Sequence, residues 1–160
     1  MGAPDGERPR CVRSAASRGE ERRIADPDAP SLLIDTGIFS DLLRGGDRAA
    51  RYAPHLEGQR IALSFQTVGE LWYGAIKARW GEAKRGQLDE RIRRYVVLAC
   101  DEATVRAWAE LRARVEEHGL SKQTTDLWIA ATAERHGLPL LTRDSGFFTA
   151  LEIEVIDVGS

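Results

Sequence analysis

The residues Leu32-Leu33-Ile34-Asp35-Thr36-Gly37-Ile38-Phe39, LLIDTGIF, place an acidic side chain at the end of a short apolar run. A wholly apolar run of this length predicts a strand that is buried on both faces, as in a parallel sheet. The following residues 37–44, GIFSDLLR, predict a helix that ends at Gly45-Gly46. Asp35 therefore stands at a predicted strand-to-helix turn.

The same alternation of strand and helix patterns continues along the chain and predicts an α/β sandwich around a central parallel sheet of about five strands. Strands are predicted at residues 31–35, 60–64, 96–99, 138–142 and 151–157, and helices at residues 37–44, 47–58, 66–80, 84–95, 101–119 and 124–137. Asp47 and Asp101 are predicted to cap the helices that follow them. Two helices have predicted core-facing stripes, which are Val68, Leu71, Trp72, Ala75 and Ile76 in one and Val105, Trp108, Leu111 and Val115 in the other.

Length and composition indicate one folded domain with an extension. A chain of 160 residues with 42% hydrophobic and 30% charged residues is typical of a soluble single domain. Residues 1–30 contain few large apolar side chains, so we predict a disordered extension, or a start codon placed too early, before a domain at residues 31–160.

The remaining bulk features favour a cytoplasmic protein. The net charge of −2 argues against wrapping of duplex DNA by charge alone. Cys11 and Cys100 have no disulfide or metal-binding spacing. No apolar run reaches the roughly 20 residues of a membrane helix, and the first residues lack the apolar core of a signal peptide.

Four acidic residues are candidates for one site. Asp35 and Asp144 follow predicted strands, Asp126 lies in the first turn of a helix, and Glu70 lies on a helix face away from the core. The carboxyl ends of parallel strands and the adjoining helix N-termini form the ligand crevice of an open sheet. Two carboxylates about 6 Å apart repel by about 3 kcal/mol at an effective dielectric of 20, so the group needs a cation or must stay partly protonated.

Oxygen ligands without His or Cys suit Mg²⁺ or Mn²⁺, which support phosphodiester hydrolysis. Each acid taken alone also fits an ordinary turn, helix-dipole or solvated position. Asp101 resembles Asp126 locally, but no strand end brings it to the crevice. The tripeptide Asp35-Thr36-Gly37 is also that of aspartic proteases, which need two copies in an all-β fold, whereas this chain has one copy followed by helical patterns.

Four segments taken together resemble the PIN-domain family, and within it the VapC-type ribonuclease toxins of type II toxin–antitoxin pairs. The resemblance runs from Ser31 to about Val158 and consists of LLIDTGIFSDLL, IALSFQTVGELWYGA, TTDLWIAATAERHGLPLLTRDSGFF and EIEVID. Its motif residues are Ser64, Thr67, Glu70 and Leu71, then Asp126, Ile129, Ala130, Ala131 and Ala133, then Thr142 and Asp144. Two features depart from the pattern: Gly37, where Asn or Ser is frequent, and the N-terminal extension.

The resemblance implies a PIN-like three-layer sandwich and a Mg²⁺-dependent endoribonuclease, with Mn²⁺ as a substitute ion. It implies a metal site at Asp35 and Asp126 that Asp144 and Glu70 complete, with Thr142 orienting a water, a carboxylate or a phosphate. It also implies an RNA substrate, a homodimer and inhibition by a VapB-like antitoxin.

Two further readings remain open from the sequence. One is a non-catalytic binding module of the same fold that acts through an antitoxin and operator complex, and the other is a DNA-directed or flap-type nuclease. The side chains of Trp72, Tyr73, Ile76 and Trp80 exceed what one helix face usually buries, so we expect part of this surface to bind a second copy or the antitoxin. Lys77, Arg79 and Arg143 are expected at the rim of the site, where they guide RNA phosphates.

Overall fold

The sheet that the sequence predicts is present in the computed structural model, which describes residues 28–120 and 124–159. Its five strands are all parallel and lie in the order β3-β2-β1-β4-β5. They are β1 (Leu32–Ile34), β2 (Ile61–Ser64), β3 (Val96–Leu98), β4 (Leu140–Thr142) and β5 (Val155–Asp157). The predicted strands and their parallel arrangement are therefore confirmed.

The described helices connect these strands, and most strands run directly into a helix. They are α2 (Thr36–Arg44), α3 (Asp47–Leu56), α4 (Phe65–Lys77), α5 (Glu82–Ile92), α6 (Glu102–Glu117), α7 (Thr124–His136) and α8 (Ser145–Ala150). The sequence did not predict α8, which is a helix of six residues. The other six helices match the predicted segments.

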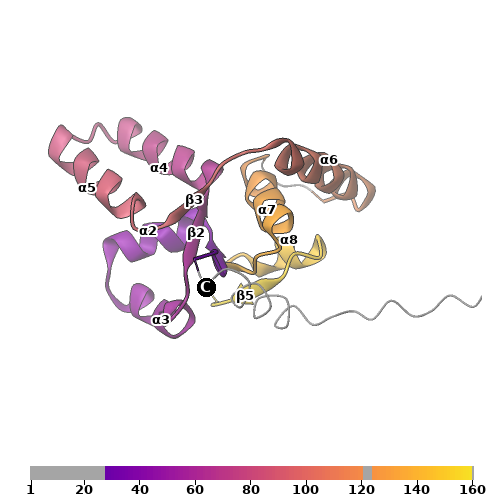
Figure 1. Cartoon of the computed structure of the whole chain (residues 1–160), viewed down its shortest axis with the longest axis horizontal. Coiled ribbons are helices and arrows are strands. Elements are labelled where there is room, and N and C mark those ends of the chain that lie inside the picture. The colour runs from indigo at the N-terminus through magenta and orange to yellow at the C-terminus, as the bar shows by residue number, and fades with distance from the viewer. Residues whose placement is uncertain (1–27, 121–123, 160) are drawn as a thin grey trace, which may run out of the picture.

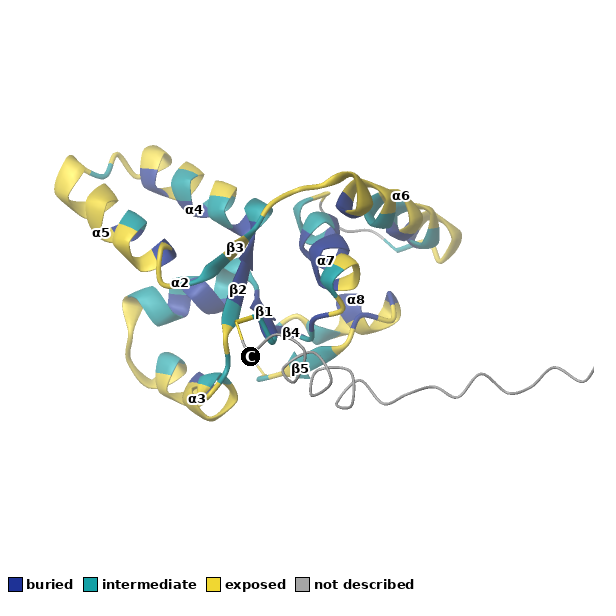
Figure 2. Cartoon of the chain, in the orientation of Figure 1, coloured by how far each residue is buried: buried dark blue, intermediate teal, exposed yellow. Residues whose placement is uncertain are grey.

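Helices cover both faces of the sheet and so form three layers (Figure 1). Alternate residues of a strand point to opposite faces. Leu32 and Ile34 of β1 pack in the apolar cluster formed with α2, α3, α4 and α5, whereas Leu33 packs in the cluster formed with α6, α7 and α8. Figure 2 shows the central strands buried between helices whose outer faces are exposed. The predicted three-layer sandwich is therefore confirmed.

Two residues predicted to face the core are instead exposed. The exposed fraction is 63% for Ile76 of α4 and 46% for Val105 of α6. In α6 the preceding residue, Thr104, is buried instead, whereas in α4 the predicted stripe is one residue too wide: Ala75 is buried as predicted and Ile76 is not. Successive residues differ by about 100° around a helix axis, so a stripe misplaced by one residue turns a side chain to solvent.

The two predicted aspartate caps differ. Asp101 caps α6, because its carboxylate accepts a hydrogen bond from the backbone N–H of Thr104. The prediction for Asp47 was wrong: it is the first residue of α3, and Gly46 occupies the cap without a side-chain hydrogen bond.

The sequence also predicted a disordered N-terminal extension and no membrane helix. Residues 1–27 of the predicted disordered extension lie outside the described residues. Within the part of the chain that the structure describes, no helix is long and apolar enough to cross a membrane.

Candidate active site

The direction in which the chain adds strands to the sheet reverses between β1 and β4. From β1 the chain continues to β2 and β3 on one side of the sheet, and then crosses to β4 and β5 on the other side. Ligands of open α/β sheets bind at such a switch in direction, outside the carboxyl ends of the strands. Asp35 directly follows β1, and Thr142 is the last residue of β4.

The Asp35 carboxylate is held in one orientation by contacts on both of its oxygens. Oδ1 accepts a hydrogen bond of 2.7 Å from the backbone N–H of Ile38 and so caps α2. Oδ2 accepts a hydrogen bond of 2.5 Å from Thr142 Oγ1. Burial raises the pKa of Asp35 above its ordinary value, and the Thr142 and Ile38 hydrogen bonds and the Arg143 charge only partly oppose this effect. A bound cation would stabilise the charge of this half-buried carboxylate.

Thr142 connects Asp35 to the loop that carries Asp144. Its side chain is fully buried, and its Oγ1 accepts a hydrogen bond of 3.0 Å from the backbone N–H of Asp144. Asp144 itself precedes α8 and is exposed. A carboxylate, one of the three groups that the sequence predicted for Thr142 to orient, is in contact with it.

Glu70 is joined to the residue next to Asp35. Thr36 Oγ1 donates a hydrogen bond to Glu70 Oε2, which links α2 to α4. Thr36 Oγ1 also lies 3.3 Å from Thr67 Oγ1, and Thr67 Oγ1 lies 3.1 Å from Ser64 Oγ. These contacts explain the spacing of Ser64, Thr67 and Glu70: two hydroxyl groups lie beneath the carboxylate and fix α4 against α2.

A hollow of about 510 Å³ opens beside this contact, between α2, α4 and α5. Thr36 and Glu70 lie among its lining residues, together with mainly apolar side chains that include Leu71 and Trp80. A long or bulky ligand at the acidic edge would therefore have an apolar groove next to it.

Asp126 lies in the first turn of α7, as predicted, and is half-buried. The structure joins Asp35 to Thr142 and Thr36 to Glu70, but it does not gather the four acids into one group. Among the described residues, no three His, Cys, Asp or Glu side chains lie close enough to hold one metal ion. The four-carboxylate metal site therefore stays a prediction. The donor types fit Mg²⁺ or Mn²⁺, because every candidate ligand is a carboxylate and Asp35 is half-buried.

Sequence reasoning missed Asp41 and Tyr52, which lie close to the site. Asp41 is only 3% exposed, and Tyr52 Oη donates a hydrogen bond of 2.8 Å to its Oδ2. Arg143, predicted at the rim, lies 3.5 Å from the same carboxylate. The signal was available: Asp41 stands three residues after Ile38, on the apolar face of α2.

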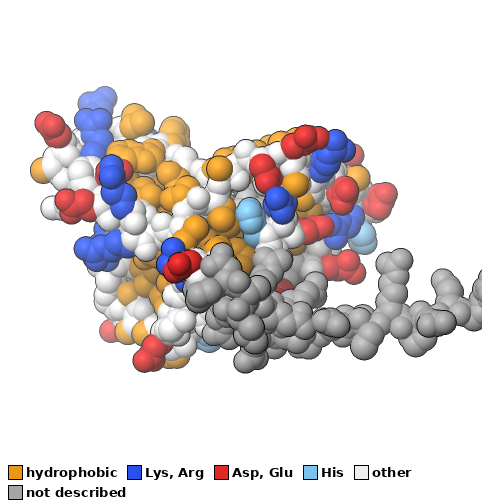
Figure 3. Space-filling view, viewed as in Figure 1, with side chains coloured by type: hydrophobic (Ala, Val, Ile, Leu, Met, Phe, Trp, Pro, Cys, Tyr) orange, Lys and Arg blue, Asp and Glu red, His pale blue; other side chains and the backbone are white. Residues whose placement is uncertain are grey.

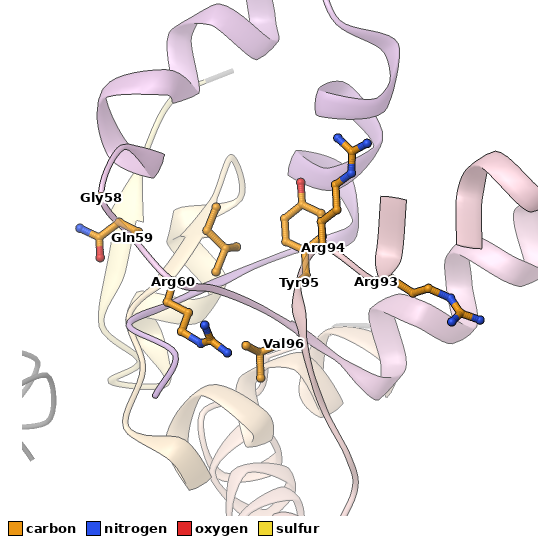
Figure 4. Close-up of a pocket in the computed structure, with 8 residues that line it drawn as sticks. Gly58, Gln59, Arg60, Arg93, Arg94, Tyr95 and Val96 are labelled. Carbon is orange, nitrogen blue, oxygen red and sulfur yellow. The ribbon is translucent and has the colours of Figure 1, made fainter. Parts of the chain in front are cut away.

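A larger hollow, of about 750 Å³, lies at the opposite ends of the strands, beside the N-termini of β2 and β3. Its lining includes Arg60, Arg93 and Arg94, whose side chains point in different directions in Figure 4. None of the predicted acids lines this hollow, so the carboxyl ends of β1 and β4 are the better candidate for catalysis.

Comparison with known proteins gives a consistent result. Residues 32–151 match the PIN domain. The chain is 34% identical over 129 residues to "Ribonuclease VapC4" of Mycobacterium tuberculosis, covering 79% of this chain and 95% of that protein. It is 31% identical over 135 residues to "Toxin FitB" of Neisseria gonorrhoeae, covering 79% of this chain and 96% of that protein.

A solved structure agrees. VapBC-5 from M. tuberculosis, described as a member of the VapBC family of toxin-antitoxin systems, superposes with a TM-score of 0.59 at 30% identity. The superposition covers 80% of this chain and 99% of that one. The matched residues 32–151 run from β1 to the end of α8 and include the positions of the four candidate acids, and we conclude that this chain belongs to the PIN-domain family.

Proposed function

We propose that this protein is a Mg²⁺-dependent endoribonuclease that hydrolyses RNA phosphodiester bonds, and that it is the toxin of a type II toxin–antitoxin pair in the cytoplasm. The observation that carries the proposal is the Asp35 carboxylate, half-buried at the switch point and fixed by Thr142 from the neighbouring strand. The similarity to proteins named as VapC ribonucleases and as a toxin supports the same function.

In this proposal Asp35 and Asp126 hold the metal ion, and Glu70 and Asp144 complete the acidic site. A bound Mg²⁺, or Mn²⁺ in its place, supplies a water of lowered pKa and stabilises the leaving oxygen. Thr142 keeps Asp35 Oδ2 in position, and Thr36 keeps Glu70 on the same edge of the sheet. Precise placement of these oxygens is what the protein contributes to the rate.

We also propose that the chain forms a homodimer and binds a VapB-like antitoxin. Tyr73 and Ile76 on α4 are 64% and 63% exposed, whereas Trp72 and Trp80 are partly buried against the core. Figure 3 shows hydrophobic side chains at the surface near α4 and α5, with basic side chains beside them. Solved relatives described as toxin–antitoxin systems support such a partner.

The test is cleavage of RNA by the purified, antitoxin-free protein with Mg²⁺ and with excess chelator. We expect cleavage with Mg²⁺ only, and loss of cleavage in Asp35→Asn with the fold retained. Undiminished cleavage in excess chelator would exclude the metal mechanism. Lack of cleavage under all ionic conditions would favour the non-catalytic binding module.

A further inference from the structure

A buried carboxylate on α2 holds an arginine next to the proposed catalytic acid. Asp41 accepts a hydrogen bond from Tyr52 Oη of α3, and its Oδ2 lies 3.5 Å from Arg143 Nε. Arg44 Nη1 lies 3.5 Å from Oδ1 of the same residue. A buried charge is tolerated only when it is paired and hydrogen-bonded, and here three donors from three segments satisfy it.

Arg143 extends from this carboxylate across Gly37 toward Asp35. A Cβ atom placed on Gly37 would lie 3.1 Å from Arg143 Nη2 and 3.3 Å from Asp35 Oδ1. Gly37 does not have a positive φ, so the backbone of α2 does not require glycine there. The absence of a side chain instead allows the guanidinium and the carboxylate to approach each other, which accounts for glycine at this position.

The terminal nitrogens of Arg143 are available to a ligand. The arginine uses Nε toward Asp41, and about one third of its side chain is exposed. Among the described residues, Asp41 is the ion-pair partner of Arg143, and the closest approach between the two uses Nε. An arginine with one edge anchored and the other directed at a site presents a fixed pair of donors, which matches the geometry of a phosphate group.

The geometry points to a positioning role for Asp41 and Tyr52: they hold Arg143 so that its terminal nitrogens bind the phosphate of the RNA whose cleavage Asp35 supports. This inference rests on the proposed ribonuclease function and adds to it the group that binds the phosphate. Arg143 contacts the substrate, whereas Asp41 and Tyr52 act through Arg143. No bond is formed or broken by these three residues.

The first measurement compares steady-state cleavage of one RNA by wild type, Arg143→Gln and Arg143→Lys. We expect kcat/KM to fall about 10- to 100-fold in Arg143→Gln, the usual effect of losing a charged hydrogen bond, with partial recovery in Arg143→Lys. Arg106→Gln is the matched control, because Arg106 pairs with Glu102 on the exposed surface of α6. Wild-type values of kcat/KM in Arg143→Gln would overturn the inference while leaving the ribonuclease function intact.

The second measurement tests positioning. Tyr52→Phe and Asp41→Asn should lower kcat/KM in wild type but have no further effect in the Arg143→Gln background. Equal losses in both backgrounds would show that they act independently of Arg143. Should Asp41→Asn fail to fold, Tyr52→Phe alone carries the test, because it removes one hydrogen bond from Asp41 and changes no charge.

A third measurement does not depend on cleavage. Affinity for a short single-stranded RNA, measured in chelator by fluorescence anisotropy, should fall in Arg143→Gln, and the slope of log affinity against log salt should decrease by about 0.7. An unchanged slope would overturn the phosphate contact. If the wild type does not cleave RNA but still binds it more tightly than Arg143→Gln does, the proposed ribonuclease function is overturned and the phosphate contact of Arg143 is not.

Discussion

Asp35 and Asp101 have the same local structure and opposite environments. Each caps a helix, accepting a hydrogen bond from a backbone N–H three residues later, and each accepts one from a threonine hydroxyl. Each also has an arginine nearby, Arg143 or Arg135.

The pKa values of the two carboxyl groups nevertheless shift in opposite directions. Arg135 and Thr104 bind Asp101 at the exposed corner of α6 and α7 and hold its pKa well below the ordinary value. Burial dominates at Asp35 and raises its pKa. Helix capping is therefore common to both aspartates, whereas desolvation at the switch point distinguishes Asp35 from Asp101.

The largest expected effect separates the two aspartates by activity. Asp35→Asn should lower RNA cleavage by roughly 100-fold or more, because loss of a metal ligand exceeds the 10- to 100-fold cost of losing its supporting contacts. Asp101→Asn should cleave like wild type, since asparagine still caps α6. Steady-state cleavage with circular dichroism as the folding control measures both, and equal losses would remove the distinction.

The supporting threonines give the next largest effect. Thr142→Val removes the hydroxyl that orients Asp35 and should lower kcat about tenfold. Thr104→Val removes the equivalent hydroxyl at Asp101 and should lower only the urea midpoint of unfolding. An unchanged kcat in Thr142→Val would show that the backbone N–H of Ile38 is enough to orient Asp35.

Added Mg²⁺ should raise the melting temperature by binding at the proposed site that includes Asp35 and Asp126, and Asp101 should not contribute to this rise. At about 100 times its Kd, a ligand of the native state adds about 2.7 kcal/mol, which raises the melting temperature by roughly 5–10 °C. We expect this rise in wild type and in Asp101→Asn, and a much smaller one in Asp126→Asn. The full rise in Asp126→Asn, measured by thermal melts, would exclude Asp126 as a metal ligand.

The smallest expected effect is on the pH dependence of stability in chelator. The folded pKa of Asp101 lies below its ordinary 3.8, so its stabilisation is present above pH 3.8 and is lost as pH falls toward the folded value. The folded pKa of Asp35 lies above 3.8, so its contribution is greatest below pH 3.8 and is lost as pH rises through the folded value.

Urea midpoints between pH 3 and 7 test these opposite signs. Relative to wild type, Asp101→Asn should become less stable as pH rises, and Asp35→Asn should become more stable. Curves that move in the same direction would mean that the two environments do not differ as described.

The sequence by itself determined the order of the elements and the position of Asp35. Apolar runs such as Leu32–Ile34 are read from local spacing alone, and they predicted the parallel sheet and the strand-to-helix turn. The short α8 and the exposed Ile76 and Val105 were not predicted, because a six-residue helix has almost no periodicity and neighbouring apolar residues do not reveal which one faces the core.

Only the tertiary structure decided which polar groups meet. Thr142 and Asp35 are 107 positions apart in the chain, and Arg143 reaches Asp41 from a different element. Strand order brings these side chains together and determines how much water surrounds each one. A carboxylate's energy depends on that solvation and on charges within a few ångströms, and neither is a property of its sequence neighbours.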